Sequence, residues 1–149
     1  MKRRKNSRES LKLNSMTQSN RLVIDTHGLI WHLGQSDRLP DRARKRLRDI
    51  DEGEAVGLVP VIVLAEAAYI FEKKRTKVSL TEVLEEIDSG DNYRILSFDR
   101  EQLEKMVELK DVPEMHDRII AAVADIEGAQ VITKDEEMRK AESIETIWN

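Results

Sequence analysis

Four acidic residues lie beside or inside apolar segments, where a carboxylate is unusual unless it has a chemical role. Asp25 directly follows the aliphatic run 21–24, and Glu66 lies inside the mostly apolar stretch VIVLAEAAYIF. Asp117 precedes the apolar run IIAAVA, and Asp135 follows VIT after one lysine. Because an unpaired carboxylate in apolar surroundings is costly, we interpret the four acids as one group that binds a cation.

The chemistry of such a group favours a hard divalent cation. Four carboxylates in one place repel one another and take up protons unless a cation balances their charge. The ligands are oxygen atoms, and the chain has no cysteine, so Mg²⁺ or Mn²⁺ is favoured over Zn²⁺. These ions orient a water for in-line attack on a phosphodiester and lower its pKa, so no histidine or lysine base is needed.

Some of these residues also have ordinary structural explanations. An aspartate at a helix start is often an N-cap, which would suit Asp117 and Asp135. Thr133 and Glu136 also fit a capping box. Asp25 and Glu66 are harder to explain in this way. His27 and His116 flank the acids and either contact the substrate or are structural, and His32 is expected to be structural.

Strands that alternate with helices would bring the acids together. Apolar runs predict strands at 21–24, 54–59, 93–98, 129–133 and 145–148. Between them, helical periodicity and end signals such as Gly53, Ser79, Gly90 and Gly128 predict helices, with Pro60 in the first turn of one. This alternation indicates an α/β fold with a mostly parallel sheet. The carboxyl ends of parallel strands share one edge, so we expect the acids to converge there.

Composition limits the classes of protein that remain. The 149 residues suit a single domain. Hydrophobic residues make up 40% of the chain, but no apolar run approaches the roughly 20 residues that span a bilayer. We therefore expect no membrane segment and see no signal peptide. The absence of cysteine fits a cytoplasmic protein.

The net charge of −4 is unevenly distributed. Residues 1–20 carry six Lys/Arg and one acid, and we expect a disordered basic tail that either attracts nucleic acid or is a solvated extension. The rest of the chain carries a net charge of −9, so RNA would have to be held by local patches and a metal. The basic helix face at 43–48 could be such a patch. Aromatic residues are only 4% of the chain, which argues against a base-stacking surface.

The order of five motifs resembles the PIN domain family, and within it the VapC-type toxins. The motifs are VIDTHGLIW, VLAEAAYIF, MHDRIIAAVA, VITKDEEM and ETIW, and the resemblance covers residues 21–149. It implies a three-layer α/β/α domain whose central parallel sheet has four to five strands in the order 3-2-1-4-5. The family's acidic quartet then corresponds to Asp25, Glu66, Asp117 and Asp135, and its two hydroxyl positions to Thr26 and Thr133.

The resemblance also implies a function and partners. A protein of this type is an Mg²⁺- or Mn²⁺-dependent endoribonuclease that cleaves RNA through a metal-activated water. It acts as the toxin of a type II toxin–antitoxin pair, dimerises with itself and is inhibited by a VapB-type antitoxin. The basic tail departs from the family pattern.

Two other functions remain open at this point. A phosphatase could use Asp25 as its nucleophile, but the usual second acid two residues later is replaced by His27, and no Gly-rich phosphate loop is present. Alternatively, the chain could be a non-catalytic PIN-like module that binds RNA or protein. The presence of all four acids argues against such a decayed site.

Overall fold

A five-stranded parallel sheet with the order β3-β2-β1-β4-β5 forms the centre of the computed structural model, which describes residues 20–74, 76 and 78–149. The strands are β1 (Arg21–Ile24), β2 (Val56–Pro60), β3 (Tyr93–Leu96), β4 (Gln130–Ile132) and β5 (Thr146–Ile147). All neighbouring strands pair in parallel. The predicted fold class and strand order are therefore confirmed. The tail predicted at 1–20 lies, apart from residue 20, outside the described residues.

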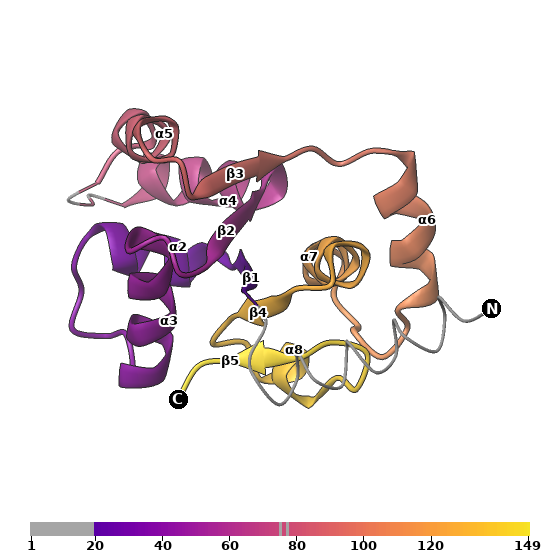
Figure 1. The fold of residues 1–149 in the computed structure, drawn as a ribbon. Helices are drawn as coiled ribbons and strands as arrows, with labels where there is room; N and C mark the ends of the chain where they lie inside the picture. Colours follow the sequence, from indigo (N-terminus) through magenta and orange to yellow (C-terminus); the bar gives the residue numbers. More distant parts are fainter. Residues whose placement is uncertain (1–19, 75, 77) are drawn as a thin grey trace.

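Helices cover both faces of this sheet. They are α2 (Thr26–Leu33), α3 (Asp41–Asp51), α4 (Val61–Lys73), α5 (Leu80–Ser89), α6 (Arg100–Glu108), α7 (Met115–Glu127) and α8 (Glu136–Lys140). In Figure 1, α3 and α5 lie on one side of the strands, and α6 and α7 lie on the other. In the part of the chain that the structure describes, no helix is long and apolar enough to cross a membrane.

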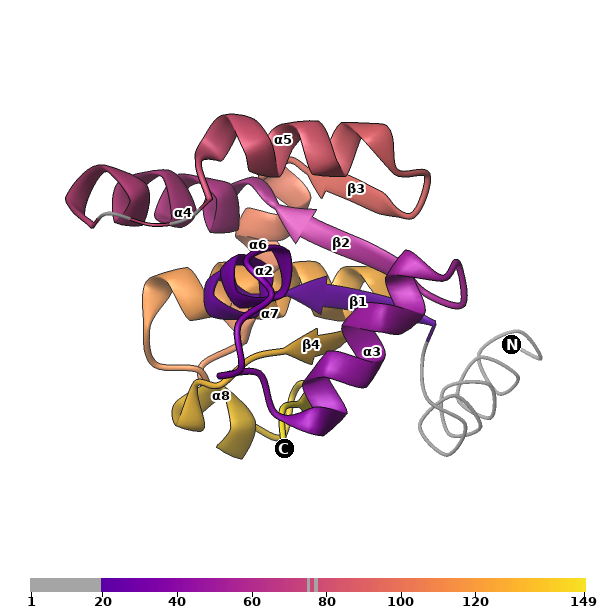
Figure 2. The ribbon, with the colours of Figure 1, turned by 90° about the vertical axis from the view of Figure 1, so that its left-hand side faces the viewer.

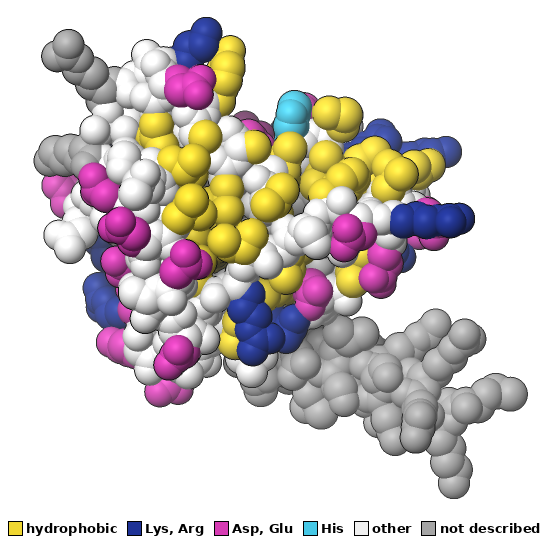
Figure 3. Space-filling model, turned by 90° about the horizontal axis from the view of Figure 1, so that it is seen from above, with side chains coloured by type: hydrophobic (Ala, Val, Ile, Leu, Met, Phe, Trp, Pro, Cys, Tyr) yellow, Lys and Arg dark blue, Asp and Glu magenta, His cyan; other side chains and the backbone are white. Residues whose placement is uncertain are grey.

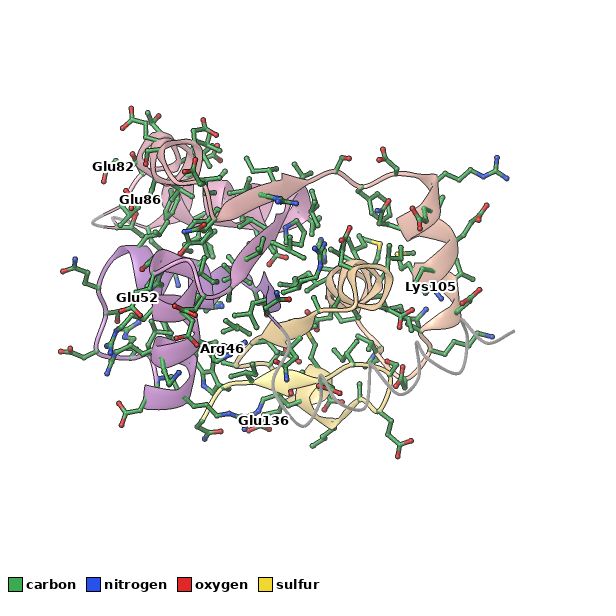
Figure 4. All side chains as sticks on the ribbon, in the orientation of Figure 1. Arg46, Glu52, Glu82, Glu86, Lys105 and Glu136 are labelled. Atoms are coloured by element: carbon green, nitrogen blue, oxygen red, sulfur yellow. The ribbon has the colours of Figure 1, made fainter. Side chains whose placement is uncertain are left out.

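Helix α7 is buried because it lies between the sheet and α6. Its residues 119–124 are all buried, which explains the nearly continuous apolar pattern in the sequence. The outer helix α6 is attached to it in part by Lys105, whose ammonium lies 3.1 Å from the Asp125 carboxylate (Figure 4). Gly128 ends α7 with φ +61°, a left-handed conformation that glycine adopts without steric cost.

The predicted boundaries are correct for β1 and shift at other elements. Pro60 was expected in the first turn of a helix, but it is the last residue of β2 and has extended φ and ψ angles of −61° and 142°. Strand β3 ends at Leu96 rather than at residue 98, because Asp99 caps α6 and its backbone N–H donates to Gln102 at 2.9 Å. The cap predicted at Ser79 is confirmed, since its hydroxyl accepts from the Glu82 N–H at 3.2 Å.

The carboxyl edge of the sheet is where the helices that carry functional candidates begin. Figure 2 shows α2 and α4 starting close to the arrowheads of β1 and β2. The first of these connections has no loop, because Asp25 alone separates β1 from α2. Side chains at the strand ends and in the first helical turns are therefore held by regular, packed elements.

Candidate active site

Asp25 is fixed by two hydrogen bonds at the end of β1. The backbone N–H of Thr26 donates to its Oδ1 atom at 2.7 Å, and the hydroxyl of Thr133 donates to its Oδ2 atom at 2.6 Å. Asp25 is also the N-cap of α2, where the positive end of the helix dipole favours a carboxylate. Both oxygens of this side chain thus have a defined orientation before any ligand binds.

Thr133 connects the ends of the two central strands. Its side chain is fully buried, and besides donating to Asp25 it accepts a hydrogen bond from the Asp135 N–H at 3.0 Å. Asp135 caps α8 by accepting from the Met138 N–H at 3.0 Å. Asp135 is therefore an N-cap, as the structural explanation predicted, whereas the capping box predicted between Thr133 and Glu136 is wrong.

Asp117 is not the N-cap of α7. That position belongs to Glu114, whose carboxylate accepts from the Asp117 N–H at 2.8 Å and contacts His116 Nδ1 at 2.6 Å. Asp117 lies in the first turn of the helix, so its own carboxylate is not used for capping. Glu114 has no recognisable capping signal in the sequence, because glutamate is not among the residues that usually cap helices.

The four acids affect one another electrostatically. Burial raises the pKa of Asp117 to about 7, and the negative charges of Asp135, Asp25, Glu114 and Glu66 add to this rise. The pKa of Glu66 is also raised, first by burial and then by Asp25, although His116 opposes the shift. The structure therefore brings all four predicted acids together at the carboxyl edge of the sheet, with Glu114 as a fifth acid beside them.

A divalent cation fits the donor chemistry of this site. Across residues 20–149, leaving aside the two undescribed positions, no three Asp, Glu, His or Cys side chains form a ready-made metal site. Like charges favour such a separation of the carboxylates. However, the donors are oxygens, and a dication among them would counter the repulsion that raises the pKa of Asp117 and Glu66.

The four acids do not line the cavity between α3 and α5. A cavity of about 570 Å³ is bordered by α3 and α5, and its walls include Arg44, Arg48, Glu82 and Glu86 but none of the four acids. Glu82 and Glu86 are labelled on α5 in Figure 4. The four acids are themselves half-buried. Their carboxylates are therefore partly open to solvent and to a ligand.

The basic face predicted at 43–48 is not a continuous solvated surface. Arg46 is 6% exposed and forms an ion pair with Asp49 at 2.6 Å. Arg44 donates to the carbonyl of Leu39 at 2.8 Å. These two arginines are used at least in part to hold α3 and the loop before it.

A doubly wound α/β domain with acids at the carboxyl edge of its sheet belongs to a broad structural class. A comparison with models of protein families identifies the family within this class. The model named PIN domain matches residues 22–143, and the chain belongs to the PIN domain family. No curated protein sequence matches the chain at a significant level.

Solved structures agree with this fold. VapBC2 from Rickettsia felis, bound to a DNA fragment from its promoter, matches with a TM-score of 0.65 and 18% identity over 87% of this chain and 99% of that one. FitAcB from Neisseria gonorrhoeae gives 0.62 and 17% over 86% and 96%. VapC20 from Mycobacterium tuberculosis, a toxin that cleaves the sarcin–ricin loop, gives 0.59 and 14% over 83% and 98%. The chain thus resembles VapC toxins in fold.

Replacing Thr133 with valine tests the connection between the two central strands. We expect the free energy of unfolding to fall by about 1–3 kcal/mol, because Asp25 Oδ2 and the Asp135 N–H both lose a partner. We also expect Mn²⁺ affinity to fall by roughly 10–100-fold, since the hydroxyl orients a candidate ligand. Urea unfolding and calorimetric titration measure these effects. The Thr133→Ser variant keeps the hydroxyl and should stay close to wild type, whereas unchanged Mn²⁺ binding by the valine variant would contradict the role of the hydroxyl.

Proposed function

We propose that the protein is an Mg²⁺- or Mn²⁺-dependent endoribonuclease. The observation that supports this most strongly is that the charges of Asp135, Asp25 and Glu66 all act on the half-buried Asp117 at one edge of the sheet. PIN domains generally use divalent metal ions. A concentration of acids at the surface of a negatively charged body would repel RNA, and a cation would reverse that effect.

In this proposal the four carboxylates hold the ion, and Thr133 orients the carboxylate of Asp25. Asp25 and Asp117 are the main candidates for direct ligands, while Glu66 and Asp135 complete the negative site. A bound ion would offset negative charge on the phosphodiester and would lower the pKa of a water, so that the water loses a proton more easily and can attack as hydroxide. Thr133 fixes one oxygen of Asp25, and the Thr26 N–H fixes the other. The protein therefore places negative charge where the ion would bind, and it fixes the orientation of the Asp25 carboxylate.

Cleavage of a mixed structured RNA tests this function. The purified protein should produce discrete internal cuts with Mg²⁺ or Mn²⁺ and none with EDTA, and Asp25→Asn should remove the cuts. Metal and RNA binding without any cuts would instead favour a non-catalytic module. Release of phosphate from a small phosphoester, without RNA cleavage, would favour a phosphatase that uses Asp25 as nucleophile.

We further propose that the protein is the toxin of a toxin–antitoxin pair with a VapB-type antitoxin. The support is the likeness in fold to VapBC2 from R. felis and to a toxin–antitoxin complex from Klebsiella pneumoniae. A growth test checks this proposal. Expression of the active protein in a bacterial host should arrest growth of the host, and expression of Asp25→Asn should not.

A homodimer is the third part of the proposal. Large apolar side chains are exposed on α4, on β3 and the segment after it, on α6 and at the start of α7, namely Val61, Tyr69, Ile95, Phe98, Leu103, Val107 and Met115. Figure 3 shows hydrophobic side chains gathered on the face seen from above. Contiguous apolar surface of this kind marks association sites. Light scattering of the purified protein should give twice the chain mass, and a monomer at micromolar concentration would contradict the proposal.

A further inference from the structure

Two cationic side chains lie over the same tryptophan ring beside the acidic site. The Arg38 guanidinium carbon is 5.6 Å from the centroid of the Trp31 ring, and the Lys134 ammonium is 5.1 Å from it. Trp31 is in α2, Arg38 is in the following loop, and Lys134 follows β4. We call these three residues the tryptophan–cation cluster.

The cluster borders the acids from two directions. Lys134 stands in the chain directly between Thr133 and Asp135. On the other side, the ring of His27 meets Trp31 in an edge contact, with centroids 5.6 Å apart, and His27 is two residues from Asp25.

The arrangement is unlike an ordinary solvated ion pair. Among the described residues, neither Arg38 nor Lys134 lies within ion-pairing distance of a carboxylate. Lys134 thus lies over the indole ring although Asp135 is its sequence neighbour. Each cation–π contact is worth only about 0.5–1 kcal/mol at an exposed site. Both cations are exposed, and neither has a carboxylate within ion-pairing distance among the described residues, so both are available to bind an anion.

We propose that the tryptophan–cation cluster binds the RNA backbone phosphate next to the bond that is cut. The inference rests on the proposed ribonuclease function and adds a substrate-binding site to it. Arg38 and Lys134 bind the phosphate, and Trp31 is a positioning residue whose ring both cations contact. Residues 21–149 carry a net charge of −9, so local cations are needed to hold RNA near four carboxylates.

The test is RNA binding measured in EDTA, where no metal-dependent cleavage occurs. A fluorescent single-stranded RNA is titrated with the wild type, with the double variant Arg38→Gln/Lys134→Gln, and with the control Arg94→Gln/Arg100→Gln. The control removes the same charge from β3 and α6, and both of its residues are exposed. We expect the cluster variant to bind on the order of 10-fold more weakly, with a log–log salt slope smaller by about 0.7 than that of the control, since each phosphate that is no longer neutralised removes about 0.7.

Trp31 needs a readout that separates positioning from stability. In steady-state cleavage, Trp31→Leu should raise KM for RNA more than it lowers kcat, and Trp31→Phe should restore most of the loss because it keeps an aromatic face. Thermal unfolding identifies a variant that fails to fold, because Trp31 also packs against the hydrophobic core. In that event the double variant, whose two side chains are exposed, still decides the question.

The outcomes separate this inference from the function on which it rests. If the wild type cuts RNA and the cluster variant binds RNA as well as the control does, the cluster is overturned and the nuclease stands. If only the cluster variant loses affinity and salt dependence, the inference is supported. If the wild type neither binds nor cuts RNA, the proposed function fails and the inference fails with it.

Discussion

Replacing Asp25 with asparagine should reduce metal-dependent RNA cleavage by about 10²–10³-fold or more, the range found when one charge-stabilising group is removed from an active site. The substitution keeps the size of the side chain but removes its charge. The Thr26 N–H can still donate to the amide oxygen, whereas the amide nitrogen would then face the Thr133 hydroxyl. That hydroxyl can rotate and accept, so the fold should survive while the negative charge is lost.

The experiment compares cleavage rates under single-turnover conditions, with Mn²⁺ saturation established by titration. Asp88→Asn is the matched control, because it makes the same chemical change at an exposed position of α5. The control should cut like the wild type. Circular dichroism should show that both variants are folded. A folded Asp25→Asn protein that cuts RNA at the wild-type rate would remove Asp25 from the active site and would contradict the proposed acidic metal site.

Much of the sheet and its acids could be predicted because the signals are local. Apolar runs, an abrupt acid after 21–24 and the glycine at 128 define strands and helix ends without knowledge of the fold. The order of the strands needed the family resemblance. Glu66 stood out because a carboxylate inside an apolar helix is rare. In the structure, burial and then the negative charge of Asp25 raise its pKa.

The parts that could not be predicted depend on contacts between distant segments. Thr133 fitted both a capping box and the family's hydroxyl position, and the sequence did not indicate that its hydroxyl reaches Asp25, which is 108 residues away in sequence. Nothing in the sequence around Lys134 indicates that its ammonium lies over Trp31. Glu114 gave no capping signal at all. In each case a polar group had several local partners available, and tertiary packing determined which partner it met.

The metal-free protein should lose stability as the pH rises from about 4 to about 7. Asp117 has a pKa of about 7 in the folded protein and near 3.8 when unfolded. Between these values the folded state binds more protons than the unfolded state, so each increase in pH lowers the free energy of unfolding. After a discount for partial exposure, we expect a loss on the order of 1–2 kcal/mol from this residue. Urea unfolding in EDTA at pH 5, 6, 7 and 8 measures it.

Asp117→Asn should flatten this dependence, because asparagine does not titrate, and should make the metal-free protein more stable than the wild type at pH 7 and above. Asp88→Asn should leave the slope unchanged. Saturating Mn²⁺ should remove or reverse the slope in the wild type, since a dication favours the ionised carboxylate, and Mn²⁺ affinity should therefore weaken below pH 7. The repulsion among the carboxylates lowers the free energy of unfolding without metal, and relief of the same repulsion by Mn²⁺ contributes to the affinity for the ion. If Asp117→Asn had the same pH dependence of the free energy of unfolding in EDTA as the wild type, the raised pKa of Asp117 would not be the cause of that dependence.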